Sequence, residues 1–298
     1  MKLFWVWGLV PLASGCHATE VRPSKERFLD VTYVANEGFL IESAGRKVLV
    51  DALFGDDEIN WCHVPSSETR EHLAAASAPF AGVNLVLVSH RHVDHFNSGL
   101  VLAHLKSNPD ARLVAPREAV LRLREDPAWS PHFEGQIEEI ALELYETKSL
   151  SSDGIGLDVH RVRHGFYPDE DPETGEIRNR HETVEQLVFV LELGGARIVH
   201  LGDAFLHENR EFFESERFSA PAIDLVFLEG LTTESLAILE QRLAPQHVVM
   251  MHLPQDPETI DRIAGSLAEA VPAAVVFRSR MQGRRFVISR EEPGFVSR

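Results

Sequence analysis

The chain has 298 residues, which allows one large domain or two of ordinary size, and its 44% hydrophobic residues suffice for a buried core. Aspartate and glutamate (46) outnumber lysine and arginine (29), so the net charge is −17 at pH 7. Such a surface repels polyanions and disfavours nucleic acid as a partner. Two cysteines are too few for a disulfide framework.

The N-terminal residues have the composition of an export signal. Lys2 is the only charged residue before Cys16, and the apolar stretch between them is too short for a permanent transmembrane helix. Small residues directly before a cysteine resemble a bacterial lipoprotein signal, in which the cysteine carries the lipid. We therefore expect residues 1–16 to be a signal peptide and Cys16 to be lipidated. His17 then favours the periplasmic side of the outer membrane, with plain secretion or an uncleaved anchor as alternatives.

A polar linker at residues 17–27 is expected to precede a domain over residues 28–298. The first strands alternate apolar and polar residues as half-buried strands do, and they are expected at residues 29–33, 38–43 and 47–51. A polar loop containing Trp61 follows, and then a helix at 67–76. The continuous apolar run at 83–88 predicts a strand that is buried on both faces.

The remainder of the chain alternates helices and strands. Helices are expected at 97–106, where Asn97 is placed to cap the first turn, and at 117–123, 232–243 and 257–270. Strands are expected at 111–115, 136–150, 155–163, 185–193, 197–201, 224–228, 247–251, 273–278 and 285–289. A long acidic loop occupies residues 165–183. Because no linker divides the chain, we predict one α+β domain in which two packed sheets have helices outside them.

A cluster of metal-ligand residues follows the buried strand, where residues 89–97 read Ser-His-Arg-His-Val-Asp-His-Phe-Asn. His90 and His92 are two positions apart, so in extended backbone they project to the same side. Asp94 and His95 follow where the chain turns toward the next helix, and they can face a second point nearby. Imidazole nitrogen and carboxylate oxygen are the ligands that borderline divalent metals accept. The segment therefore predicts a metal site at the rim of a sheet.

This His-x-His-x-Asp-His segment resembles the signature of the metallo-β-lactamase superfamily. The resemblance implies a four-layer αβ/βα sandwich, the metallo-β-lactamase fold, and a binuclear metal-dependent hydrolase. Further positions match the family pattern in chain order, and they are Asp51, His164, Asp203 and His252. The resemblance assigns the first metal to His90, His92 and His164. It assigns the second to Asp94, His95 and His252, with Asp203 shared and Asp51 orienting the metal loop from behind.

Some histidines compete for these roles. His160 and His181 are alternatives to His164, although the position of His164 at the end of a strand favours it. His200, next to the Gly-Asp element, is interpreted as a packing residue. Cys62 is interpreted in the same way, as a lone thiol that packs in the interior.

The resemblance also implies the chemistry. Two divalent ions, zinc with iron or manganese as alternatives, would generate hydroxide for attack on a small ester, lactone or phosphodiester, and Asp94 would take or pass the proton. The loops around Trp61 and His63 and around Phe166 and Tyr167 are expected to line the pocket. The Gly-Asp element and the Met-His-Leu-Pro segment are most similar to the branch with ascorbate-6-phosphate lactonase and N-acyl-phosphatidylethanolamine-hydrolysing phospholipase D.

Three alternatives to this function stay open. They are a β-lactam hydrolase, an iron-dependent oxygenase or reductase on the same fold, and a lipid-anchored envelope protein without catalysis. The expected partner is a small-molecule substrate. No nucleic acid is expected to bind, and contact with the membrane is expected only through the N-terminal lipid.

Overall fold

The computed structural model describes residues 27–55, 58–218, 222–272 and 274–289. The expected signal peptide and its Cys16 lie outside the described residues. Of the expected linker only Arg27 is described, and it begins the first strand instead of ending a linker. Across the described ranges, no helix combines the length and apolar character that crossing a membrane requires.

The first sheet has seven strands, in the spatial order β16 (Gln282–Ile288), β1 (Arg27–Ala35), β2 (Gly38–Ser43), β3 (Arg46–Val50), β4 (Leu85–Leu87), β5 (Arg112–Pro116) and β6 (Ile137–Ile140). The strands from β16 to β3 pair antiparallel, and those from β3 to β6 pair parallel. Its helices are α1 (Ser67–Ala74), α2 (Ser98–Ser107), α3 (Arg117–Glu125) and the 3-10 helix η1 (Pro131–Gln136). Asn97 caps α2 as predicted, because its side chain accepts the N–H of Leu100.

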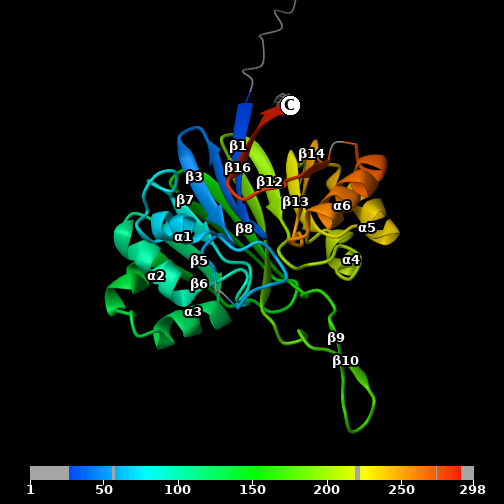
Figure 1. The fold of residues 1–298 in the computed structure, drawn as a ribbon, viewed down its shortest axis with the longest axis horizontal. Helices are drawn as coiled ribbons and strands as arrows, with labels where there is room; N and C mark the ends of the chain where they lie inside the picture. Colours follow the sequence, from blue (N-terminus) through cyan, green and yellow to red (C-terminus); the bar gives the residue numbers. More distant parts are fainter. Residues whose placement is uncertain (1–26, 56–57, 219–221, 273, 290–298) are drawn as a thin grey trace, which may run out of the picture. The chain divides into compact units, whose positions relative to one another are not determined.

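The second sheet also has seven strands, in the order β15 (Ala274–Val276), β14 (His247–Met251), β13 (Leu225–Glu229), β12 (Ala196–His200), β11 (Gln186–Leu193), β8 (Ile155–Val162) and β7 (Thr147–Ser152). The strands from β15 to β12 are parallel, and the others pair antiparallel. Its helices are α4 (Arg210–Phe213), α5 (Thr233–Ile238), the π-helix η2 (Leu239–Leu243) and α6 (Pro257–Ala270). Figure 1 shows α1–α3 on one side of the sheets and α4–α6 on the other, which confirms the predicted four-layer sandwich.

The main core lies between the two sheets. Phe39 of the first sheet contacts Phe227 of the second, with ring centroids 4.5 Å apart. β4 explains the continuous apolar run in the sequence, because its alternate side chains enter different cores. Leu85 and Leu87 pack between the sheets, whereas Val86 packs against the helices of the first sheet. The prediction of a strand buried on both faces is therefore confirmed.

The strand predicted at residues 136–150 is wrong as a single element, because it is two strands in different sheets. β6 ends at Ile140 in the first sheet, and β7 begins at Thr147 in the second. Between them Tyr145 has a φ of 66°, a left-handed conformation that interrupts extended backbone. No glycine or proline separates the two strands, so the sequence does not mark the crossing.

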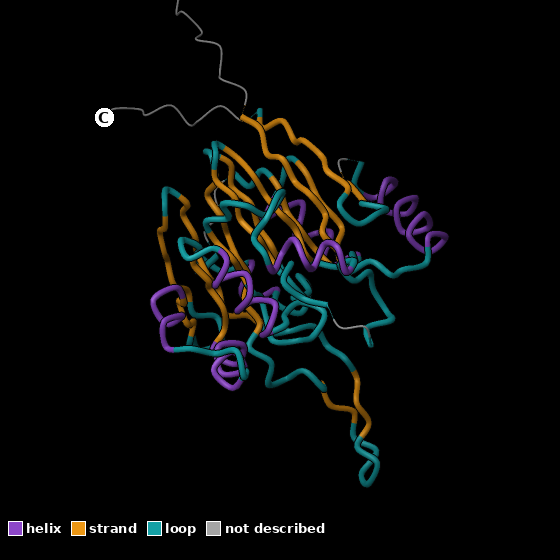
Figure 2. The backbone as a smooth tube through the Cα atoms, turned by 60° about the vertical axis from the view of Figure 1, so that its left-hand side comes forward, coloured by secondary structure: helices purple, strands orange, loops and turns teal. Residues whose placement is uncertain are grey.

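The acidic segment predicted as a loop at residues 165–183 contains a short hairpin of β9 (Pro168–Glu170) and β10 (Ile177–Asn179). Its turn is held by Asp171, whose side chain accepts the N–H groups of Glu173 and Thr174. Figure 2 shows the hairpin extending away from both sheets. The segment was expected to be irregular because its strands are short and exposed, so they carry no apolar alternation.

Candidate metal centre

The residues predicted to bind metal follow the ends of strands in both sheets. Within the first sheet, β3 and β4 run parallel, and within the second β12, β13 and β14 do, so the carboxyl ends of each group meet at one edge. The side chains that lie within three positions after the ends of these strands, or of β8, are Asp51, His90, His164, Asp203 and His252. His92, Asp94 and His95 come from the loop between β4 and α2. The fold thus brings together segments that are far apart in sequence.

The first ligand set consists of His90, His92, His164 and Asp203, with one ligand atom of each within 4.8 Å of the others. His92 Nδ1 lies 2.9 Å from His90 Nε2 and 3.3 Å from His164 Nε2. Asp203 Oδ2 lies 3.2 Å from His164 Nε2 and 3.7 Å from His90 Nε2. Ligands about 2.1 Å from a tetrahedral zinc are separated by about 3.4 Å. The spacing of this set therefore fits a metal ion at its centre.

The second ligand set consists of Asp94, His95 and His252, again with ligand atoms within 4.8 Å of one another. Asp94 Oδ2 lies 3.8 Å from His95 Nε2 and 3.6 Å from His252 Nε2. Asp203 joins the two sets, because its Oδ1 lies 3.1 Å from His95 Nε2. Apart from this contact with each other, these two buried atoms have no hydrogen-bond partner. Buried ligand atoms without further partners are expected where a metal ion binds.

Asp51 holds this arrangement from behind. Its Oδ1 accepts the Ser89 N–H at 2.7 Å, and its Oδ2 accepts the Ser89 hydroxyl at 2.6 Å. The same Oδ2 lies 3.2 Å from His95 Nδ1, which turns the other ring nitrogen toward Asp203. A carboxylate in this position orients a ligating imidazole and raises its basicity. Asp51 itself has a φ of 44°, an unusual conformation for a residue other than glycine.

Gly202 is a position near the site where the backbone requires glycine. It has a φ of 53°, and a Cβ atom there would approach Ser89 Cβ to 2.8 Å and also collide with the Gln186 side-chain amide. Its neighbour Asp203 can therefore point into the site only because residue 202 lacks a side chain. This explains the Gly-Asp pair in the sequence.

The competing histidines take other positions. His160 lies on β8, where its Nδ1 pairs with the Thr147 hydroxyl at 2.8 Å and its ring packs against Phe212. His181 does not lie in either ligand set, but its Nδ1 approaches His164 Nδ1 to 3.3 Å. Its ring also contacts that of His92, so it supports the ligands from the side. His200 is buried and packs against aromatic rings between the sheets, as expected.

The electrostatics of the first set suit a metal ion. Burial, followed by the neighbouring histidines, lowers the pKa of His92 to about 3, and burial likewise lowers the pKa of His90. Both imidazoles are therefore neutral at pH 7, the form in which histidine binds metal. In the second set burial opposes the charged form of His252, but Asp203 and Asp94 outweigh it and raise the pKa of His252 to about 9. A cation is thus favoured between these carboxylates.

Two acidic residues at the site were missed by the sequence reasoning. Glu37, in the turn between β1 and β2, is fully buried, and Glu229, at the end of β13, lies 3.3 Å from His252 Nδ1. Glu229 Oε1 also accepts the hydroxyl of Tyr167. Each of them is followed by a glycine at the edge of a strand. Gly38 begins β2, and Gly230 comes directly after β13. That signal was present in the sequence, but it is too common to mark a site.

A pocket of about 620 Å³ opens onto both ligand sets. The loops predicted to line it contribute Trp61 and Tyr167, and Trp61 Nε1 donates to Asp94 Oδ2 at 3.2 Å. His63 and Phe166 do not line this pocket, so that part of the prediction is wrong. Phe166 is instead 47% exposed at the surface. Two cationic side chains, Arg122 and Arg180, complete the pocket wall.

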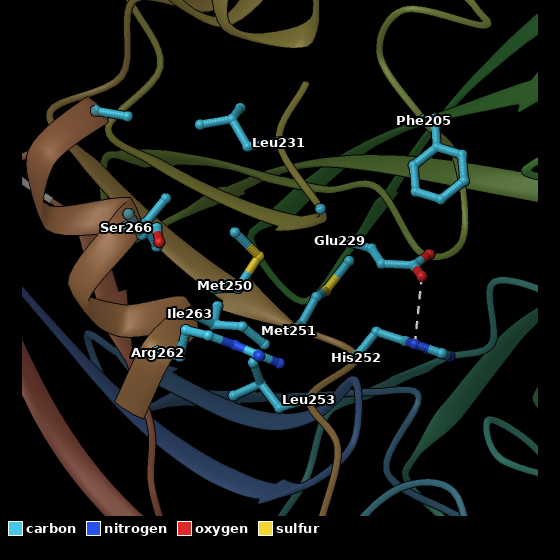
Figure 3. A pocket seen from close by; sticks show the side chains of 13 residues that line it. Phe205, Glu229, Leu231, Met250, Met251, His252, Leu253, Arg262, Ile263 and Ser266 are labelled. Carbon is cyan, nitrogen blue, oxygen red and sulfur yellow. Dashed lines mark ion pairs between the residues drawn. The ribbon is translucent and has the colours of Figure 1, made fainter. Parts of the chain in front are cut away.

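A second pocket, of about 490 Å³, lies on the other side of His252. Figure 3 shows it between the end of β14 and one face of α6, with the Glu229–His252 ion pair at its edge. Its wall is mainly apolar, and the apolar side chains are Phe205, Leu231, Met250, Met251, Leu253, Ile263, Leu267 and Ala270. His252 borders both pockets, so the second pocket adjoins the candidate metal centre.

Two sheets packed face to face, with histidines and carboxylates gathered at the ends of their strands, define a protein of the metallo-β-lactamase fold. The sequence model of a protein family, the beta-lactamase superfamily domain, matches residues 46–276. The chain therefore belongs to the beta-lactamase superfamily.

Individual proteins agree with this assignment. A UPF0173 metal-dependent hydrolase from Pyrococcus furiosus is 23% identical over 251 residues, which cover 81% of this chain and 94% of the relative. A possible metal-dependent hydrolase from Veillonella parvula aligns with a TM-score of 0.57 at 14% identity, over 86% of this chain and 98% of that one. The metallo hydrolase Igni18 from Ignicoccus hospitalis aligns with a TM-score of 0.54 at 17% identity, over 87% and 98%. The structural similarities, at these identities, concern the fold.

Proposed function

We propose that this protein, a metal-dependent hydrolase of the beta-lactamase superfamily, holds two divalent metal ions and hydrolyses a small ester, lactone or phosphodiester. The observation that carries the proposal is the convergence of two ligand sets that share Asp203. Two divalent ions in these sets would lower the pKa of a shared water toward neutrality and so supply hydroxide at pH 7. Zinc is the proposed metal, with iron or manganese as alternatives.

The predicted ligands would bind the two metal ions in two groups. His90, His92 and His164 would hold one ion, and Asp94, His95 and His252 the other. Asp94 borders the substrate pocket, where it is in position to take or pass a proton. Its oxygen is held by Trp61, and its pKa is lowered because the attraction of His95 and His252 outweighs burial. Asp94 is therefore ionised at neutral pH.

The pocket walls restrict the substrate further. Arg122 and Arg180 give the metal pocket a positive rim on a chain whose net charge is −17. Guanidinium groups bind phosphate and carboxylate with directed hydrogen bonds, so we propose a substrate that carries a negative charge. The apolar pocket beyond His252 leaves room for an apolar substituent of the same molecule.

The site of action is proposed to lie outside the cytoplasm. This rests on the sequence at residues 1–16 and on Cys16 as a lipid-bearing residue. Mass spectrometry of protein purified from membranes tests it, because a lipid adduct on an N-terminal Cys16 is expected. A chain that begins at Met1 in the soluble fraction would contradict the proposal. The placement in the lactonase and phospholipase D branch likewise stays a prediction.

Metal quantification on the purified protein, followed by a substrate screen, tests the proposed activity. We expect about two metal ions per chain and turnover of a lactone, phosphodiester or other ester. Hydrolysis of β-lactams alone would identify a different hydrolase. Iron content together with oxygen consumption would identify an oxygenase. This fold also hosts such chemistry, because a mutant of the CmlA beta-hydroxylase has a similar structure. It aligns with a TM-score of 0.51 at 14% identity, over 90% of this chain and 55% of that one. Less than one ion per chain would contradict catalysis.

A further inference from the structure

A group of three carboxylates lies beside the two ligand sets. Its members are Glu37, Asp203 and Glu229, and one oxygen of each lies within 4.8 Å of the others. Glu37 comes from the turn between β1 and β2 in the first sheet, whereas Asp203 and Glu229 follow or end strands of the second. Glu37 is fully buried and Asp203 is 3% exposed. We call these three residues the carboxylate cluster.

Four of the six oxygens of the carboxylate cluster accept no hydrogen bond. Both carboxyl oxygens of Glu37, Oδ1 of Asp203 and Oε2 of Glu229 are buried without a hydrogen bond. In the described part of the chain no lysine or arginine forms an ion pair with any of the three. Buried carboxylates are strongly unfavourable unless a cation or a proton compensates them. Asp203 faces His95 and His164, and Glu229 pairs with His252, so Glu37 is the member that still needs a positive partner.

The nearest histidine does not meet this need. His95 Nδ1 lies 3.8 Å from Glu37 Oε2, but it lies closer to Asp51 Oδ2, at 3.2 Å, and that geometry directs its proton to Asp51. His95 Nε2 faces Asp203 and the second ligand set. When His95 binds metal through Nε2, its Nδ1 proton serves Asp51. Glu37 is left without a partner.

The charges of the whole centre point the same way. The buried or nearly buried carboxylates are Glu37, Asp51, Asp94, Asp203 and Glu229. When all five are ionised and the hydroxide of the proposed function is bound, two divalent cations with neutral histidine ligands would leave two negative charges without compensation. A third divalent cation in the carboxylate cluster would balance them.

We propose that Glu37, Asp203 and Glu229 bind a third divalent cation through oxygen ligands only. This cation would lie beside the two ions of the proposed function, and the inference rests on that function because Asp203 is shared. An all-oxygen donor set suits hard cations of the manganese, magnesium and calcium class, whereas imidazole ligands suit zinc. Zinc would occupy the histidine-rich sets, and a hard cation the carboxylate cluster. The protein then carries two kinds of metal in one centre.

Manganese titration of zinc-loaded protein tests this proposal. The full-length protein is loaded with two equivalents of zinc and titrated with Mn²⁺, whose free and bound forms are separated by their electron paramagnetic resonance signals. Elemental analysis after removal of free ions gives both metals per chain. We expect one bound manganese per chain while both zinc ions remain.

Two variants and a control locate the ion. Glu37→Gln and Glu229→Gln should each weaken manganese binding at least tenfold and leave the zinc content unchanged. Glu208→Gln is the matched control, because Glu208 lies near the site and accepts the Phe166 N–H at 2.9 Å but is outside the carboxylate cluster. It should bind manganese as the wild type does. If one glutamine variant does not fold, the other variant and the wild-type titration still decide.

Three results would overturn the inference. Manganese that appears only as zinc leaves would show exchange in the ligand sets and no third site. Zinc lost from Glu229→Gln would place that residue in the second ligand set. No bound manganese, with Glu37→Gln more stable than the wild type, would show that the carboxylates share protons. A wild type that binds no zinc would contradict the proposed function itself, whereas two zinc ions without manganese would contradict only the third site.

Discussion

Asp51 and Asp94 have different roles at this site. Both oxygens of Asp51 already have partners, because they accept the N–H and hydroxyl of Ser89 and one of them faces His95. Asp94 by contrast borders the pocket, and Trp61 and Asn36 donate to its carboxylate. Two aspartates 43 positions apart therefore take different roles because of what surrounds each carboxylate.

Replacing Asp94 tests its role. We expect Asp94→Ala to lower kcat by at least about 10²-fold, because it removes both a proposed metal ligand and the proton acceptor. The fold should persist, since Asp94 lies on a loop at the pocket and not in the core. Circular dichroism and the melting temperature of the metal-free variant check this. Asp110→Ala, at an exposed loop position, is the control, and full activity of metal-loaded Asp94→Ala would contradict the assignment.

His160 makes the metal-free protein sensitive to acid. Burial lowers the pKa of His160 to about 4 from its ordinary value of 6.5. The unfolded chain therefore binds a proton that the folded protein excludes, so the stabilisation is complete above pH 6.5 and is lost as the pH falls toward 4. The loss should be on the order of 3 kcal/mol.

Chemical denaturation between pH 7 and pH 4 measures this effect. The unfolding free energy of the metal-free wild type should fall more steeply with acid than that of His160→Gln. The difference between the two proteins isolates His160 from His92 and His181, whose pKa values are also lowered. Parallel slopes would show that His160 does not titrate in this range.

At the scale of elements, α6 forms one wall of the apolar pocket. Ile263, Ser266 and Leu267 line the pocket from one face of this helix, and Met250 and Met251 line it from β14. Asp256 caps the first turn of the helix by accepting the N–H of Thr259. Side chains that this helix places in the wall therefore help to set the pocket volume, and with it the size of substrate that fits.

Filling that pocket should change specificity. Ser266→Trp is expected to reduce kcat/KM about tenfold or more for substrates with a long apolar substituent, because each lost methylene contact costs about 1–3 kcal/mol. Substrates with a short substituent do not reach this part of the pocket, so their kcat/KM should not change. Steady-state kinetics on a series of esters of increasing chain length measures this. Ala268→Trp, on the same helix but outside the pocket wall, is the control. An equal loss for all chain lengths would show damage to the site instead.

At the scale of the whole molecule, the metal centre joins the two sheets. His90, His92 and Asp94 belong to the half of the chain that forms the first sheet, and His164, Asp203 and His252 follow strands of the second. A metal bound between them stabilises the folded state only, because the unfolded chain does not bring these segments together. Metal binding and the packing of the two sheets are therefore coupled.

Chelation should consequently destabilise the protein. A metal ion whose free concentration is about a thousand times its dissociation constant adds about 4 kcal/mol to the free energy of unfolding. Its removal should therefore lower the melting temperature by roughly 5–15 °C. Differential scanning calorimetry with and without a chelator measures the shift. His92→Ala should melt near the chelated wild type and respond little to the chelator. An unchanged melting temperature of the wild type would contradict the coupling.

Much of the fold and part of the site follow from local sequence. The run at residues 83–88, the cap at Asn97 and the ligand segment at 89–97 are short-range patterns, and each has a counterpart in the structure at or near the predicted place. Backbone periodicity and capping act over a few residues, so sequence is sufficient for them. Candidate ligands at strand ends could be named for the same reason.

Other features depend on contacts between distant segments. The division of residues 136–150 between two sheets, the burial of Glu37 beside Asp203 and the side-by-side pockets at His252 have no local signal. Whether a histidine such as His164 or His160 faces the metal centre depends on how its strand is seated against the other sheet. Sequence alone determined which residues could bind metal and on which elements they lie. The packing of the sheets decided which of them meet, because burial and charge at one point depend on the whole chain.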